Sequence, residues 1–277
     1  MNSISEFNRF TAELKEDGYV MPVLFVGHGS PMNGIEDNQF SQAWRKMASE
    51  IPRPNAVLVV SAHWLSNGTR ITAMDFPPTI HDFGGFPQAL FEVQYPAPGS
   101  PEIAIETASI LKSFHAELDH DWGLDHGAWT VVRHMYPDAT IPVLQLSIDY
   151  NKGPQYHYDL AKELYSLRKK GILIMGSGNM VHNLRMVAWN KLNEPEYGYD
   201  WAFDLNDKFK NLIASGNHQD LINFSRISPN ISLAIPTSKH YLPLIYTLGL
   251  QSEKEDVMFF NDKAVGGSLT MTSVKFG

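Results

Sequence analysis

The sequence contains no cysteine among its 277 residues. This absence excludes disulfide bonds, thiolate zinc sites, iron–sulfur clusters and cysteine nucleophiles. A bound metal ion would therefore be held by histidine or carboxylate side chains. A chain of this length removes about three quarters of its surface from water on folding, so it does not need disulfide bonds to be stable.

Positive charge is also scarce, because 22 Lys and Arg against 30 Asp and Glu give a formal net charge of −8. Such a chain repels polyphosphates, which argues against a nucleic-acid partner. The longest apolar runs, such as residues 56–60, are far shorter than the ~20 residues of a membrane span. The polar, acidic N-terminus lacks the basic and apolar regions of a signal peptide. We therefore expect a soluble cytoplasmic protein without a membrane partner.

Several common catalytic motifs are missing. The chain has no HExxH, no GxxxxGK[ST] and no GxSxG, so a zincin, a P-loop and a nucleophile elbow are excluded, whereas a dispersed Ser–His–Asp arrangement stays open. Gly176 and Gly178 begin like a dinucleotide fingerprint, but Val181 occupies the third glycine position. This pattern is too weak to indicate NAD binding.

Short, continuous apolar runs recur along the chain, as buried strands of a parallel sheet require. They cover residues 22–26, 56–60, 141–146 and 172–175. Helical patterns lie between and after them, at residues 40–47, 101–114, 160–167 and 201–214. This alternation predicts an α/β fold with a mostly parallel central sheet flanked by helices.

The C-terminal region has a different pattern, in which residues 256–260 and 268–276 predict a small strand addition. No repeat, low-complexity tract or linker interrupts the chain. We therefore expect a single domain over residues 1–277, with residues 1–20 as an N-terminal extension or helix.

The eleven histidines are numerous for this composition, and their positions are informative. Three predicted strands run into His28, His63 and His182, and the carboxyl ends of parallel strands meet at one edge of a sheet. His240 follows another apolar run, residues 231–235. A single histidine beside a strand is more often a hydrogen-bonded core residue. Several at one edge favour a site for Zn or Fe(II), for which imidazole is a common ligand.

A long Pro- and Gly-rich stretch, residues 76–101, is a candidate substrate-binding loop or lid. Within it, Phe83 is a candidate for the aromatic wall of the substrate site, although a packing role is equally open. His126 lies beside a carboxylate and is a candidate acid–base group. For the adjacent pair His81 and Asp82, a turn-stabilising role explains the sequence at least as well.

The chain resembles a known family through a series of motifs, which are, in order, GHGSPM, SAHW, HDFGGFPQ, YPAPGSP, LDHGAW, PVLQLSID, GSGNMVHNLR and HYLPL. They are similar to those of the DOPA-dioxygenase type of class III extradiol ring-cleaving dioxygenases, from Met21 to the C-terminus. The resemblance implies a single catalytic domain with an α/β fold. It also implies one divalent metal ion per chain that opens a catechol ring beside its two hydroxyls with O2.

The same resemblance implies roles for particular residues. His28 and His63 match metal-binding positions, and His126 matches a histidine thought to contact substrate or dioxygen. His182 and His240 match metal positions of the DOPA-type members, whereas in the wider class the histidine at position 182 is the acid–base residue. The wider class also uses a glutamate ligand that has no counterpart here. We expect Fe(II) for turnover, with Zn(II) as the alternative bound ion.

The leading hypothesis is metal-dependent extradiol cleavage of a DOPA-like catechol to a ring-opened semialdehyde, with protons moved by His182 or His126. A zinc hydrolase that uses the same histidines is one alternative. A non-catalytic metal-binding protein is another. The sequence leaves the native catechol and the oligomeric state open.

Overall fold

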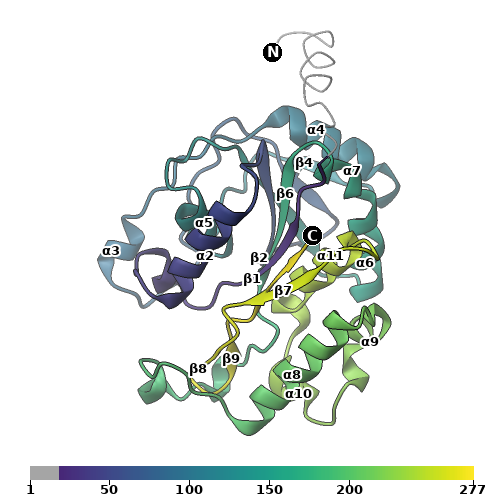
Figure 1. The fold of residues 1–277 in the computed structure, drawn as a ribbon. Coiled ribbons are helices and arrows are strands. Elements are labelled where there is room, and N and C mark those ends of the chain that lie inside the picture. Colours follow the sequence, from purple (N-terminus) through teal and green to yellow (C-terminus); the bar gives the residue numbers. More distant parts are fainter. Residues whose placement is uncertain (1–18) are drawn as a thin grey trace.

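The computed structural model describes residues 19–277, which form an eight-stranded sheet of order β4-β3-β5-β2-β6-β1-β10-β7 (Figure 1). Its centre consists of the strands that the apolar runs predict: β1 (Val23–Gly27), β2 (Ala56–Ser66), β5 (Val143–Asp149) and β6 (Ile172–Gly178). These strands pair in parallel, β1 with β6, β6 with β2, and β2 with β5. The predicted α/β fold is confirmed.

The sheet is completed at both edges by shorter strands. One edge holds β3 (Arg70–Thr72) and β4 (Glu117–Asp119), and the other holds β10 (Ser273–Phe276) and β7 (Val257–Phe260), which run antiparallel to their neighbours. A separate pair of strands, β8 (Ala264–Val265) and β9 (Leu269–Thr270), forms a small antiparallel sheet. The predicted C-terminal strand addition is present, with its last member divided into β9 and β10.

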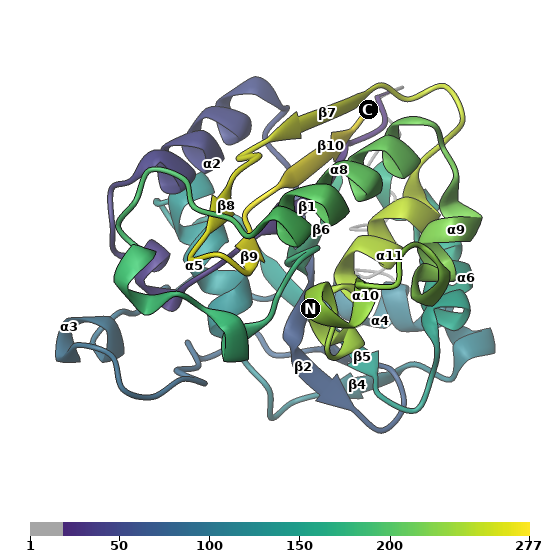
Figure 2. The same ribbon diagram turned by 90° about the horizontal axis from the view of Figure 1, so that it is seen from below.

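Helices cover both faces of the sheet. The α-helices are α2 (Gln39–Glu50), α3 (Gln88–Phe91), α4 (Pro101–Ile110), α5 (His126–Met135), α6 (Pro154–Glu163), α7 (Tyr165–Arg168), α8 (Asp200–Ala214), α9 (His218–Ile222), α10 (Ile231–Ala234) and α11 (Leu242–Leu250). The 3₁₀ helices are η1 (Pro31–Gly34), η2 (Lys112–Phe114), η3 (Leu184–Met186), η4 (Trp189–Lys191), η5 (Phe224–Arg226) and η6 (Ser238–His240). Helices α2 and α5 lie on one face and α6 and α11 on the other, as Figure 1 and Figure 2 show.

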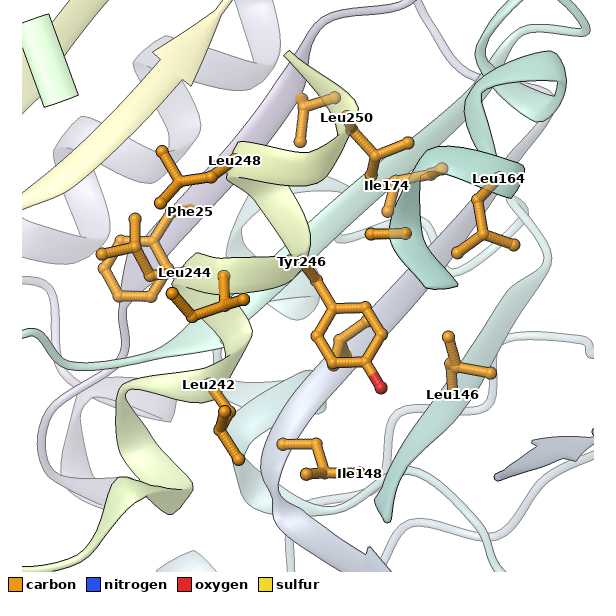
Figure 3. Packing of buried hydrophobic residues seen from close by; sticks show 14 of the residues in the cluster. Phe25, Leu146, Ile148, Leu164, Ile174, Leu242, Leu244, Tyr246, Leu248 and Leu250 are labelled. Atoms are coloured by element: carbon orange, nitrogen blue, oxygen red, sulfur yellow. The ribbon is translucent and has the colours of Figure 1, made fainter. Parts of the chain in front are cut away.

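The central strands are apolar on both sides because successive residues point to opposite faces. In β1, Val23 and Phe25 belong to the hydrophobic cluster beneath α6 and α11, whereas Leu24 and Val26 belong to the cluster beneath α2 and α5. Figure 3 shows the first cluster, in which Phe25 lies beside Leu244 and Leu248 of α11. Burial of both faces explains why these strands are continuous apolar runs in the sequence.

One predicted boundary is wrong, because the strand predicted over residues 56–60 continues to Ser66, with a register shift between Val60 and Leu65 on its β5 side. The apolar run of residues 231–235 begins with the short helix α10. The predicted N-terminal extension or helix lies outside the described residues, apart from residues 19 and 20. Within residues 19–277, no helix has both the length and the apolar character needed to cross a bilayer.

Candidate active site

Four histidines that are distant in sequence gather near the carboxyl ends of the central strands. His28 follows β1, His63 lies within β2, His126 begins α5, and His240 ends η6. The ring centre of His63 lies 5.0 Å from that of His28, 3.8 Å from that of His126 and 5.1 Å from that of His240. The centres of His28 and His240 are 5.4 Å apart. The strand ends therefore bring these imidazoles into one cluster.

A glycine at the end of β6 allows His240 to approach. A Cβ atom at Gly178 would lie 2.2 Å from the backbone oxygen of His240, closer than any real contact. The same oxygen accepts a 2.9 Å hydrogen bond from the backbone N–H of Asn179. The glycines of the GSG segment thus allow the backbone of other segments to approach closely. This packing role accounts for the glycines that resemble part of a dinucleotide fingerprint.

The hydrogen bonds of Ser177 determine which nitrogen of His28 carries the proton. The hydroxyl of Ser177 donates its only proton to the backbone oxygen of Gly127, so its oxygen accepts at 2.9 Å from Nδ1–H of His28. The Nε2 atom of His28 is then an unprotonated acceptor. His28 is 1% exposed, and burial, followed by the charges of nearby histidines, lowers its pKa well below the usual value.

His63 has the same tautomer for a different reason. Its Nδ1 lies 3.3 Å from Oδ2 of Asp82, a carboxylate that only accepts. The Nε2 atoms of His63 and His28 therefore face each other as lone pairs, 3.2 Å apart. Burial, then the nearby His126, lowers the pKa of His63 to about 3, so a proton does not occupy the gap at neutral pH.

A divalent ion fits between these two nitrogens. Ligand nitrogens about 2.1 Å from one ion are separated by roughly 3.0 Å at a right angle and roughly 3.4 Å at a tetrahedral angle. The 3.2 Å observed between Nε2 of His28 and Nε2 of His63 falls within this interval. A third nitrogen is also near, because one nitrogen from each of His28, His63 and His126 lies within 4.8 Å of the others.

The N-cap of α5 fixes the position of His126. The carboxylate of Asp125 accepts from the backbone N–H of Ala128, from the hydroxyl of Ser61 at 2.7 Å and from the amide of Gln145 at 2.7 Å. Asp125 is wholly buried, and this burial, together with the charge of Asp82, raises its pKa. The start of α5 is thereby tied to β2 and β5.

Asp82 also contacts His126. Its Oδ1 accepts at 2.9 Å from the backbone N–H of His126 and lies 3.0 Å from the ring Nδ1, at an angle too bent for a regular hydrogen bond. Partial burial acts to raise the pKa of Asp82, but the hydrogen bonds and charge of His126 outweigh it and the pKa is lowered. The carboxylate is therefore ionised at neutral pH.

The ring of His182 lies against the ring of His240. The two rings are stacked, with centres 3.6 Å apart and planes 8° apart. The Nδ1 atom of His240 is buried without a hydrogen-bond partner, which suits a ligand nitrogen. Burial lowers the pKa of both rings, to about 4 for His182, and the charge of exposed Lys239 adds to the effect.

Phe83 lies at the side of the histidine cluster, in the loop before α3. Its ring meets that of His126 edge-on with centres 5.6 Å apart, and it also contacts Phe86, Phe91 and Trp129. The neighbouring His81 is bonded through Nε2 to the backbone oxygen of Val93, 3.0 Å away. Phe83 therefore faces the histidine cluster, whereas the hydrogen bond of His81 connects this loop to the backbone after α3.

The structure thus brings together every histidine that the sequence singled out for the site, with Phe83 beside them. Sequence reasoning gave no site role to Ser177 or Asp82, whose side chains lie against Nδ1 of His28 and Nδ1 of His63. The signal for Ser177 was its place between two glycines at a strand end. For Asp82 the only signal was a carboxylate next to a histidine in a loop.

Known proteins are similar to this chain over most of its length. Residues 21–273 match the family described as the catalytic LigB subunit of aromatic ring-opening dioxygenase. The chain is 47% identical over 261 residues to an Escherichia coli K12 protein named 4,5-DOPA dioxygenase extradiol, covering 93% of this chain and 95% of that protein. A Beta vulgaris protein of the same name is 33% identical over 266 residues, covering 93% of this chain and 97% of the relative.

A solved structure is also similar. The crystal structure of an uncharacterised Escherichia coli K12 protein matches with a TM-score of 0.80 and 40% sequence identity, covering 93% of this chain and all of that one.

Proposed function

Because the chain belongs to the family of the catalytic LigB subunit of aromatic ring-opening dioxygenase, it is an extradiol dioxygenase, and we propose that its substrate is a DOPA-like catechol. The ring opens beside the two hydroxyls. Both atoms of O2 enter the product, a ring-opened semialdehyde, so no further reactant is needed. In this proposal residues 1–277 form one catalytic domain.

The facing lone pairs of His28 and His63 are the observation that supports this function. Ser177 and Asp82 hold both rings with Nδ1 protonated, which leaves the Nε2 atoms 3.2 Å apart without a proton between them. Two acceptors at this distance repel each other unless a cation lies between them. A metal-dependent dioxygenase requires such a centre.

We assign the metal to His28, His63 and His240, with Fe(II) for turnover and Zn(II) as the alternative bound ion. A metal ion lies close to the plane of each imidazole that binds it, so the stacked rings of His182 and His240 do not both bind one ion in this arrangement. His240 is the better ligand because its ring lies beside both His28 and His63. The bound ion would supply Lewis acidity toward the catechol oxygens and a place for O2.

In this proposal His182 and His126 are the groups that accept and donate protons. Burial lowers the pKa of His182 to about 4, so its ring is neutral at neutral pH. In this proposal the neutral ring takes the proton of a catechol hydroxyl whose acidity the bound ion would raise. His126 has its Nδ1 turned to Asp82 and its ring against Phe83. In this proposal His126 contacts substrate or O2, and Phe83 provides an aromatic wall for the catechol ring.

The charge of Lys239 supports the proposal that the catechol carries an acidic substituent. Its side chain is exposed, forms no ion pair among the described residues, and lowers the pKa of His28, His63, His182 and His240 through its charge. A cation that acts on this cluster suits the carboxylate of a DOPA-like substrate.

The test is oxygen uptake by protein reconstituted anaerobically with Fe(II). With DOPA we expect oxygen consumption and a yellow semialdehyde. His28→Ala and His63→Ala should lose both metal and activity, whereas His120→Ala, at an exposed position, should keep both. Iron-loaded protein that retains its metal and leaves every catechol unchanged contradicts the proposal.

A further inference from the structure

One carboxylate lies between two histidines of the site. Oδ2 of Asp82 is 3.3 Å from Nδ1 of His63, and Oδ1 is 3.0 Å from Nδ1 of His126. The two rings are themselves in contact, with centres 3.8 Å apart. Asp82 is thus the common neighbour of a proposed metal ligand and a proposed acid–base group.

The side chain of Asp82 is directed inward from an exposed stretch of chain. The residue as a whole is exposed, but its side chain is only 18% exposed. The backbone N–H of His126 donates to Oδ1 at 2.9 Å and fixes the orientation of the carboxylate. Because Oδ1 is held in this way, Oδ2 has a defined partner, the ring of His63.

A carboxylate in this position selects one tautomer for each ring. An unprotonated Nδ1 on either histidine would place a lone pair against a negative charge, even where the N–H geometry is bent. Both rings are therefore held with Nδ1 protonated and Nε2 free. For His63 the free Nε2 is the atom that faces Nε2 of His28, 3.2 Å away.

We propose that Asp82 is a positioning residue that sets the tautomers of His63 and His126 together, and so makes Nε2 of His63 available to the metal. The proposal builds on the metal centre proposed above. It also gives the loop before α3 a role in the site, because Asp82 and the adjacent Phe83 both contact His126. Displacement of the loop would release both rings at once.

The substitution Asp82→Asn is expected to change the tautomer of His63 but not that of His126. The backbone N–H of His126 retains an oxygen acceptor, so the amide nitrogen replaces Oδ2 and donates toward Nδ1 of His63. His63 must then carry its proton on Nε2, whereas His126 keeps the proton on Nδ1. We expect this exchange in ¹⁵N–¹H NMR spectra of the metal-free protein with labelled histidine.

Metal affinity provides a second measurement. Loss of a residue that orients a ligand histidine typically weakens metal binding by about 10- to 100-fold. We expect a decrease of this size in Zn(II) and Co(II) competition titrations of Asp82→Asn, with a changed visible spectrum for any Co(II) that binds. The matched control is Asp75→Asn, the same change at an exposed position of the same loop, which should keep the wild-type affinity.

Asp82→Ala removes the acceptor from both rings, and both are then expected to populate both tautomers. This second variant keeps the proposal testable if Asp82→Asn folds poorly, which far-UV circular dichroism would detect. Wild-type tautomers and wild-type metal affinity in a folded Asp82→Asn protein overturn the proposal. Failure of the wild-type protein to bind any divalent ion instead contradicts the metal centre, and the metal-free NMR spectra still decide the role of Asp82.

Discussion

The imidazole rings of His182 and His240 are nearly parallel, with centres 3.6 Å apart and planes 8° apart. Lone pairs of imidazole nitrogens lie in the ring plane, so two stacked rings direct theirs to different points. Of this pair, only His240 also has its ring beside those of His28 and His63. In the proposed assignment, His240 of this pair binds the metal and His182 transfers protons.

This division predicts opposite phenotypes for two alanine substitutions. We expect His240→Ala to lose the metal, as measured by elemental analysis after gel filtration. His182→Ala should retain it while kcat falls by about 10²- to 10⁴-fold, the usual contribution of a general acid–base group. Metal loss in His182→Ala with retention in His240→Ala would reverse the assignment.

Acid should destabilise the metal-free protein. The pKa of His63 is lowered from 6.5 to about 3 and that of His182 from 6.5 to about 4, both chiefly by burial. Below pH 6.5 the unfolded chain binds protons that the folded chain excludes, so stability falls as the pH drops toward the folded values. Each such histidine contributes a slope of about 1.4 kcal/mol per pH unit.

Urea unfolding of the metal-free protein at pH 7, 6 and 5 measures this slope before most carboxylates titrate. His63→Gln should reduce the slope, whereas His120→Gln, at an exposed position, should leave it unchanged. A free energy of unfolding that is constant from pH 7 to pH 5 would show that these imidazoles are not held neutral.

Lys239→Met should alter substrate preference. Removal of the charge near the site is expected to raise KM for DOPA by about twofold to fivefold, the range of an exposed ion pair, with no change for unsubstituted catechol. Steady-state oxygen uptake with both substrates measures the difference. Lys254→Met, another exposed lysine, is the control, and an equal change in KM for both catechols would exclude recognition of the carboxylate.

Gly178→Ala should disturb the site through the backbone. The added Cβ would lie 2.2 Å from the backbone oxygen of His240, so η6 must move away from β6. We expect a loss of about 1–3 kcal/mol in stability, typical of overpacking, together with weaker Zn(II) binding. Gly84→Ala, where an added Cβ has no atom within 4 Å, is the control. Unchanged zinc affinity in Gly178→Ala would show that the position of His240 does not limit binding.

The central strands were predictable because both faces of each are buried, which makes the sequence continuously apolar. The location of His28 followed from the same pattern, since Gly27 ends β1. The end of β2 was less predictable. Its ladder with β6 continues through Ser61, a buried polar residue that interrupts the apolar run.

The role of Asp82 was not predictable from sequence patterns. It depends on contacts with His63 and with His126, 44 residues away, and neither periodicity nor local turn chemistry encodes such contacts. The same holds for Ser177, whose partners His28 and Gly127 come from other parts of the chain. Motifs locate the imidazoles, but only the folded chain shows which side chains fix their protons.

The pairing of β1 with β10 has a consequence for biosynthesis. The backbone N–H of Gly27, next to His28, donates to the hydroxyl of Ser273, which lies 246 residues later in the chain. At about 5–20 residues per second, a ribosome needs roughly 12 to 50 seconds to make the intervening segment. The nascent chain therefore presents His28 well before its strand gains this neighbour.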